Sequence, residues 1–193
     1  MSLHINALIT VAEAKAHIGI ASGDTTHDTL LETLIAEVSD FIDTYTSRTL
    51  REQTGVSLRA RGNGMILALP QYPVASVASV TDEDGAVTPA GDYRLLADSG
   101  ILKSKGGDWG GLDYTVVCTC GYKTAGQTPS DLSLRTVPYA LVLACAKLVA
   151  KAFERRHAEG TSNTSIGQVS VGYQRELDTE VSVTLDAHKK AYV

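Results

Sequence analysis

The chain of 193 residues has few cysteines, prolines and large aromatic side chains, and no long hydrophobic run. No apolar stretch approaches the roughly 20 residues that a membrane-spanning helix needs. The N-terminus also lacks the basic and hydrophobic segments of a secretory signal. We therefore expect neither a membrane span nor a secretory leader. Hydrophobic residues make up 44% of the chain and charged residues 20%, so we expect a sizeable buried core rather than global disorder.

The three cysteines, Cys118, Cys120 and Cys145, cannot form a disulfide framework because their number is odd. Cys118 and Cys120 would lie on the same face of a strand. We interpret all three as reduced, buried thiols of a cytosolic product, since free cysteine packs as a small apolar residue. A metal or redox site is the alternative, but the five histidines are scattered without the spacing of a metal site.

Basic residues are also in the minority, and the formal net charge is −5. An acidic chain argues against a dedicated nucleic-acid-binding protein, whose usual mark is a basic stripe. The charge is unevenly distributed: residues 1–50 carry two basic and seven acidic residues, whereas residues 122–157 carry six basic and two acidic residues. These opposed segments would suit charge complementarity within or between subunits. Ordinary solvated helix faces are the alternative interpretation.

No motif in the sequence brings together the residues of a catalytic site. The glycine-rich stretch 105–111 lacks both the G-K-[ST] ending and the following helix of a phosphate-binding loop, so it predicts a tight hairpin around Trp109. The acidic residues 82–84 precede Gly85 and predict a solvated turn. Ser99 lacks the context of a nucleophile elbow. We expect no enzyme, no catalytic residue, no cofactor and no metal ion, and a hydrolase hypothesis has no group of residues behind it.

Two helices are predicted near the N-terminus. Thr10 and Glu13 have the Thr-x-x-Glu spacing of a capping box, and Gly19 supplies a C-terminal stop, so a short helix is expected between them. A long helix is expected from about Asp28 to Ser47, because apolar residues recur there at the helical period. These residues are Leu30, Leu31, Leu34, Ile35, Val38, Phe41, Ile42 and Tyr45.

After these helices, the apolar pattern changes to the alternation typical of strands and returns to the helical period at Pro138. A second long helix is expected from Pro138 to His157, packed on the first. The predicted contact joins Leu34, Val38, Phe41 and Ile42 to Leu141, Cys145 and Leu148. The helix from Pro138 also carries a stripe of four basic residues, which are candidates for an interface or a DNA-facing surface: Lys147, Lys151, Arg155 and Arg156.

The C-terminal segment is predicted to be an extended arm after a flexible linker at 158–163. Residues 166–173 and 180–185 show alternating apolar character without a long helix to fold against. The arm either docks on a partner or on a neighbouring subunit, or forms a hairpin on its own domain. Its apolar residues are Ile166, Val169, Val171, Tyr173, Val181, Val183 and Leu185.

The order of these segments resembles the head–tail connector (adaptor) proteins of tailed double-stranded DNA phages and related gene transfer agents. Three motifs carry the resemblance. The first is the Tyr-Thr-x-Arg-x-Leu ending of the long helix at 45–50, and the second is the Leu-Pro-x-x-Pro-Val-x-x-Val run at 69–77. The third is the Val-Pro start at 137–138 with the Phe-Glu-x-Arg sequence at 153–156. The similarity covers roughly Leu8 to His157.

The resemblance implies an α+β fold: a small helical core (residues 1–50 and 122–157), a β-rich insertion (51–121), and a linker with a C-terminal arm (158–193). It implies a structural virion protein of the head–tail neck, assembled in the cytoplasm of a bacterial host. The chain would form a ring, dodecameric in the family, beneath the portal protein. This ring would extend the channel for double-stranded DNA, without sequence-specific binding, and would receive stopper or tail-completion proteins. The arm would dock on the portal. A nucleic-acid-binding module that uses the basic stripe is the alternative function.

Overall fold

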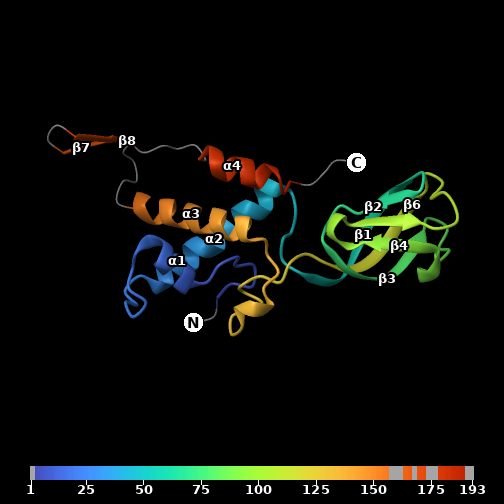
Figure 1. The fold of residues 1–193 in the computed structure, drawn as a ribbon, viewed down its shortest axis with the longest axis horizontal. Coiled ribbons are helices and arrows are strands. Elements are labelled where there is room, and N and C mark those ends of the chain that lie inside the picture. Colours follow the sequence, from blue (N-terminus) through green and yellow to red (C-terminus); the bar gives the residue numbers. More distant parts are fainter. Residues whose placement is uncertain (1–2, 157–162, 167–168, 173–177, 190–193) are drawn as a thin grey trace. The chain divides into compact units, whose positions relative to one another are not determined.

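The computed structural model describes residues 3–156, 163–166, 169–172 and 178–189. The chain forms two compact units (Figure 1). Residues 1–46 and 124–189 form the helical unit, and residues 47–123 form the β unit. The expected α+β class is confirmed, because the described residues include four α-helices and a six-stranded antiparallel sheet. Across the described ranges, no helix is long and apolar enough to cross a membrane.

The helical unit contains α1 (Val11–Ile18), α2 (Asp28–Thr46), α3 (Tyr139–Arg155) and α4 (Thr179–Asp186). The predicted capping box is confirmed at the start of α1. The Thr10 hydroxyl accepts a hydrogen bond from the Glu13 backbone N–H at 3.2 Å, and Glu13 Oε2 accepts one from the Thr10 backbone N–H at 2.8 Å. These two bonds satisfy backbone donors that no helical partner can reach, so the local sequence defines where α1 begins.

The core of the helical unit lies between α2 and α3, which pack against each other. Leu31, Ile35, Val38 and Ile42 of α2 and Leu141, Cys145 and Val149 of α3 are among its buried residues. The predicted contact was wrong for Phe41, which is 42% exposed. The buried stripe of α2 recurs every three or four residues, and Phe41 lies about 100° around the helix from Ile42. Leu34 and Leu148 are only half-buried, at the edge of this contact.

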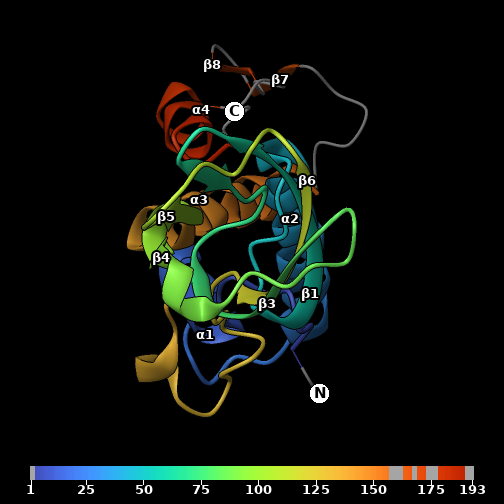
Figure 2. The same cartoon turned by 90° about the vertical axis from the view of Figure 1, so that its right-hand side faces the viewer.

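The β unit is one antiparallel sheet that curls around its own interior, with β4 and β5 on one side and β1, β3 and β6 on the other (Figure 2). The strands are β1 (Gln53–Asn63), β2 (Ile66–Ala68), β3 (Val74–Asp82), β4 (Tyr93–Leu96), β5 (Ile101–Ser104) and β6 (Asp113–Cys120), in the spatial order β3-β6-β1-β2-β5-β4. Every second residue of β6 is buried, as the alternating pattern requires. The sheet therefore encloses a hydrophobic core of its own.

The lone tryptophan fills one end of this β core. The Trp109 ring packs edge-on against Tyr114, with ring centroids 5.0 Å apart, and the Tyr114 hydroxyl donates a hydrogen bond to the Trp109 carbonyl at 3.0 Å. A Cβ added at Gly62 would lie 2.5 Å from the Trp109 Cβ, so only glycine fits there. Gly62 of β1 therefore allows the close approach of Trp109 to the sheet.

The C-terminal segment forms a two-stranded hairpin, β7 (Asn163–Ile166) with β8 (Val169–Gly172), followed by α4. The extended, strand-like conformation predicted for residues 180–185 is wrong, because Thr179–Asp186 is helical. Apolar residues at i, i+2 and i+4 fit a strand, but the i and i+4 pair also fits one face of a helix. Residues 158–162 of the expected linker and the arm residue Tyr173 lie outside the described residues.

Candidate interaction surfaces

The basic stripe predicted on α3 is largely engaged within the helical unit. Lys147 Nζ lies 2.6 Å from Glu180 Oε2, and Lys151 Nζ lies 3.3 Å from Asp178 Oδ1. Arg156, just past the end of α3, places its guanidinium 3.5 Å from the centroid of the Phe153 ring and donates to the Phe153 carbonyl. These contacts leave less positive charge available to a nucleic-acid phosphate than the sequence suggested.

Arg155, the last residue of α3 and the remaining member of the stripe, is half-buried. Helical spacing places all four basic residues on or next to one side of α3, as the sequence implied. The carboxylates opposite the two lysines lie about 30 residues further along the chain, in or next to α4. No local signal in the sequence links them to α3, so this pairing was missed.

Two buried apolar residues, two ion pairs with α3 and contacts with α2 hold α4 in the helical unit. Val181 and Leu185 are 2% and 0% exposed, whereas Val183 is 63% exposed. Of the seven candidate arm residues, Val181 and Leu185 therefore pack within the helical unit, and Val183 faces outward. Ile166, Val169 and Val171 belong to the backbone of the β7–β8 hairpin.

The C-terminal end of α4 is held by a group of polar contacts. The Tyr45 hydroxyl donates to Asp186 Oδ1 at 3.0 Å, and Lys189 Nζ lies 2.7 Å from the same oxygen. The Lys189 ammonium also lies 4.2 Å from the centroid of the Tyr45 ring. Hydrogen bonds from Lys189 and then from Tyr45 hold the pKa of Asp186 below its ordinary value. Carboxylates thus connect both ends of α4 to the rest of the unit.

A hollow of about 280 Å³ remains beside the seated helix α4. We call it the α3–α4 hollow, and Tyr139, Ala140, Leu143, Ala144, Lys147, Glu180, Val181 and Thr184 line it. Tyr139 at its rim is 75% exposed. The small alanine side chains of α3 leave this space open, and together with Tyr139 they give the hollow an apolar wall. Neither the hollow nor its position beside α4 was predicted from the sequence.

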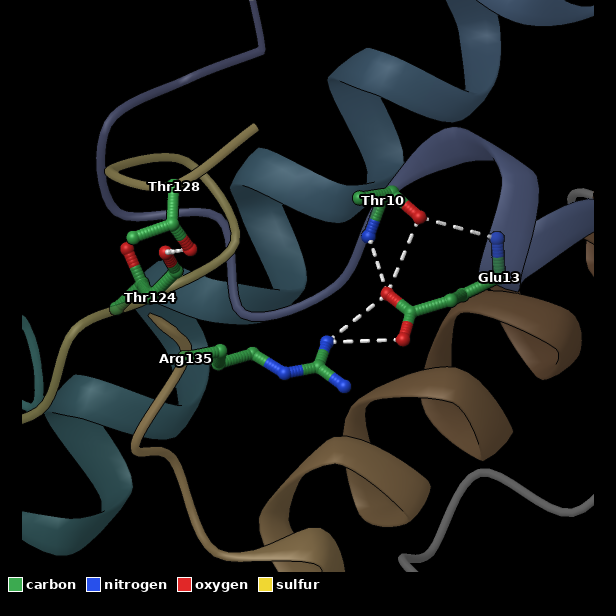
Figure 3. A network of polar contacts seen from close by, with 5 residues as sticks. All are labelled: Thr10, Glu13, Thr124, Thr128 and Arg135. Atoms are coloured by element: carbon green, nitrogen blue, oxygen red, sulfur yellow. Dashed lines mark hydrogen bonds and ion pairs between the residues drawn. The ribbon is translucent and has the colours of Figure 1, made fainter. Parts of the chain in front are cut away.

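A second polar network fixes the segment that leads into α3 (Figure 3). Arg135 Nη1 lies 2.9 Å from Glu13 Oε1 and 3.0 Å from Glu13 Oε2, so the carboxylate that caps α1 also binds this arginine. Earlier in the same segment, the Thr128 hydroxyl donates to the Thr124 carbonyl at 3.0 Å. A Cβ at Gly126 would lie 2.0 Å from the His4 carbonyl oxygen, so only glycine allows this close approach.

This anchored segment carries an exposed apolar loop. Asp131 accepts a hydrogen bond from the Ser133 N–H and so begins the short helix Leu132–Leu134. Leu132 and Leu134 are 37% and 54% exposed. These two leucines make the loop a candidate for contact with another protein chain.

The β unit has a mixed-charge hollow and a pair of buried thiols. The hollow, of about 530 Å³, is lined by Arg59, Ala60, Arg61, Asp82, Glu83, Asp113, Tyr114 and Thr115.

The three cysteines of the chain are free and buried. A hydrogen bond between Cys118 and Cys120 raises the pKa of Cys118 and lowers that of Cys120, and burial raises the pKa of Cys145 to about 12. Within the described ranges, no group of three or more histidine, cysteine, aspartate or glutamate residues could hold a metal ion.

The helical unit and the β unit thus define an α+β protein with exposed apolar residues that are candidates for interaction surfaces. A family model described as "Head completion protein" matches residues 7–191. Since this match spans nearly the whole chain, the chain belongs to the head completion protein family. This membership confirms the resemblance to head–tail connector proteins that the sequence motifs carried.

The fold is also similar to that of a solved structure. The chain matches a protein chain in the structure titled "Neck of empty GTA particle computed with C6 symmetry", where GTA stands for gene transfer agent. The match has a TM-score of 0.55 and 20% sequence identity, and it covers 100% of this chain and 94% of that chain. At this identity the likeness shows a shared fold. No curated protein matches the chain.

Proposed function

We propose that the chain is a structural protein of the head–tail neck of a phage or gene transfer agent particle. It would assemble as a ring beneath the portal protein, extend the DNA channel, and provide the surface on which stopper or tail-completion proteins dock. The observation that carries this proposal is membership of the head completion protein family over residues 7–191. A non-enzymatic role is part of the same proposal.

The surface of the helical unit supports assembly with other chains. Several large apolar residues of this unit are exposed, on α2, on the loop before α3, at the start of α3 and on α4. They are Leu30, Phe41, Leu132, Leu134, Tyr139 and Val183. A closed ring needs two different surfaces on each subunit, because each copy contacts its neighbours head to tail. Exposed apolar residues on several elements meet this requirement better than one patch would.

The charge of the chain suits a channel through which DNA passes without binding. The formal net charge is −5, and the lysines Lys147 and Lys151 are paired with carboxylates. Tight DNA binding depends on many free lysines and arginines that neutralise phosphates. The alternative function, a nucleic-acid-binding module on the basic stripe of α3, is therefore not the one that we propose.

The β7–β8 hairpin is our candidate for contact with the portal. A two-stranded hairpin alone is marginally stable, so it gains stability by packing on a further surface. Replacing residues 163–172 by a short glycine–serine linker should leave the melting temperature of the chain unchanged and remove its binding to purified portal. Loss of the fold would favour the hairpin as part of its own domain. Replacing the exposed loop residues 106–108 in the β unit is the matched control.

Complementation of heads tests the proposed function. DNA-filled heads assembled without this chain should lose DNA and fail to join tails, and adding the purified chain should restore both. Tail joining that is normal in the absence of the chain would contradict the proposal. DNA retention and infectious or transducing particles provide the two measurements.

A further inference from the structure

The surface of α3 that contacts α4 combines ion pairs with apolar packing. We call this surface the α3 groove. Two carboxylates, from Asp178 and Glu180, meet Lys151 and Lys147, and two apolar residues follow at Val181 and Leu185. The acidic N-terminal part of α4 thus lies along basic residues of α3, while its apolar face is buried. The structure thus shows a short amphipathic helix with acidic residues at its N-terminal end packed on α3.

The contact between α4 and α3 is small. Only Val181 and Leu185 are fully buried, and the α3–α4 hollow of about 280 Å³ remains open beside them. The lysine side chains are 29% and 23% exposed, and those of Glu180 and Asp178 are 74% and 52% exposed. Exposed ion pairs contribute little stability each. Contacts with α2, including the hydrogen bond from Tyr45 to Asp186, also hold α4, so an exchange transfers the contacts with both helices together.

The connection between the two helices is long enough to reach another molecule. Residues 156–178 connect α3 to α4, and ten of them, 163–172, span the β7–β8 hairpin. At about 3.3 Å per residue, the other 13 residues reach up to roughly 40 Å. Exchange of an identical element between copies keeps every contact and changes only which chain supplies it. In a ring, where neighbours are held close together, such exchange is favoured by a high effective concentration.

We propose that the α3 groove is a docking site for α4 of a second copy of the chain, so that neighbouring subunits exchange this helix. The proposal rests on the proposed function, since it specifies a contact between copies within the ring. Charge complementarity identifies α4 as the helix that binds there. Its residues Asp178 and Glu180 pair with Lys151 and Lys147, and Val181 and Leu185 are buried.

Two charge-reversed variants of the full chain test the exchange. The first variant, K147E/K151E, reverses the charge of the two α3 lysines. The second, D178K/E180K, reverses the charge of the two carboxylates at the start of α4. Each variant alone has a mismatch between its own groove and its own helix. In an equimolar mixture, exchange restores complementary charges in both grooves, because the reversed helix meets the reversed groove and the natural helix meets the natural groove.

Light scattering measures the mass of the complex, and amide hydrogen exchange measures the protection of α4. We expect each variant alone to be monomeric, with α4 amides that exchange about tenfold faster or more than in the natural chain. The mixture should form a complex of one chain of each kind, with α4 protection restored and with dissociation at high salt. Either variant mixed with the natural chain is the control, and it should form no such complex.

Two results would overturn the proposal: a mixture that stays monomeric with unprotected α4, or single variants whose α4 protection equals that of the natural chain. If a variant fails to fold, a labelled peptide of residues 178–189 replaces it. This peptide should bind a chain that carries Leu185→Asp, and K147E/K151E in that chain should weaken the binding about tenfold. Failure to bind contradicts the exchange. Assembly on the portal tests the proposed function separately, because a ring can close through other surfaces.

Discussion

Glu13 joins three parts of the helical unit, so its removal should have a measurable effect on stability. Its carboxylate accepts hydrogen bonds from the Thr10 backbone N–H at 2.8 Å and the Thr10 hydroxyl at 3.1 Å, and it forms the ion pair with Arg135 (Figure 3). Loss of a helix cap costs about 1 kcal/mol. The Arg135 side chain is only 14% exposed, so leaving it unpaired adds a further cost.

We therefore expect Glu13→Ala to lower the free energy of unfolding by about 2–3 kcal/mol. For a chain of this length, the melting temperature should fall by about 5–10 °C. Glu13→Gln retains an acceptor for the Thr10 N–H but not the charge, so it should lose about 1 kcal/mol. Glu37→Ala, on the exposed side of α2, is the matched control and should stay within about 0.5 kcal/mol.

Urea unfolding followed by circular dichroism measures these changes. A double-mutant cycle with Arg135→Met isolates the ion pair, and the coupling should exceed about 0.5 kcal/mol because the two residues are in contact. If Glu13→Ala unfolds at the same urea concentration as the natural chain, the carboxylate does not fix the start of α1 and this reasoning is wrong.

Three further predictions concern α4 and the N-terminal segment. Leu185→Ala should remove the hydrogen-exchange protection of α4, whereas Val183→Ala, at a residue that is 63% exposed, should leave it unchanged; equal effects would contradict the seating of α4. Gly126→Ala should lower the melting temperature because its Cβ would meet the His4 carbonyl, whereas Gly23→Ala has open space and should be neutral. The pKa of Asp186 lies below its ordinary value of 3.8, so its contribution is present above about pH 4 and is lost as the pH falls through the lowered pKa. Protection of α4 should fall on acidification in that window, and Asp186→Asn should remove this dependence.

Local signals allowed the first helices to be predicted closely. The capping box at Thr10 and Glu13 and the stop at Gly19 enclose α1, and the predicted range from Asp28 to Ser47 differs from α2 by one residue. These features depend on residues only a few positions apart, where spacing determines the contact. The α+β class follows from the same change of period, from helical to alternating, after the long helix.

Contacts between segments that are far apart in the chain could not be predicted from the sequence. No local pattern linked Lys15 to Asp28, yet Lys15 is 4% exposed and lies 2.5 Å from Asp28 Oδ1. The pattern of residues 180–185 fitted a strand as well as a helix. In the structure the segment is helical, and Val181 and Leu185 lie buried on one face of that helix. The lysines of α3 were placed correctly on a stripe, but their carboxylate partners lie in or beside α4. Such pairings depend on the packing of the whole unit.

The central claim is that the chain forms a ring on a portal. Mass measurement of purified portal, alone and after addition of the chain, tests this claim most directly. The account predicts that the isolated chain is monomeric or weakly associated, and that the portal gains the mass of one closed ring of subunits in a single step. A chain that does not bind the portal, or a stable twofold dimer that persists when portal is present, would contradict it.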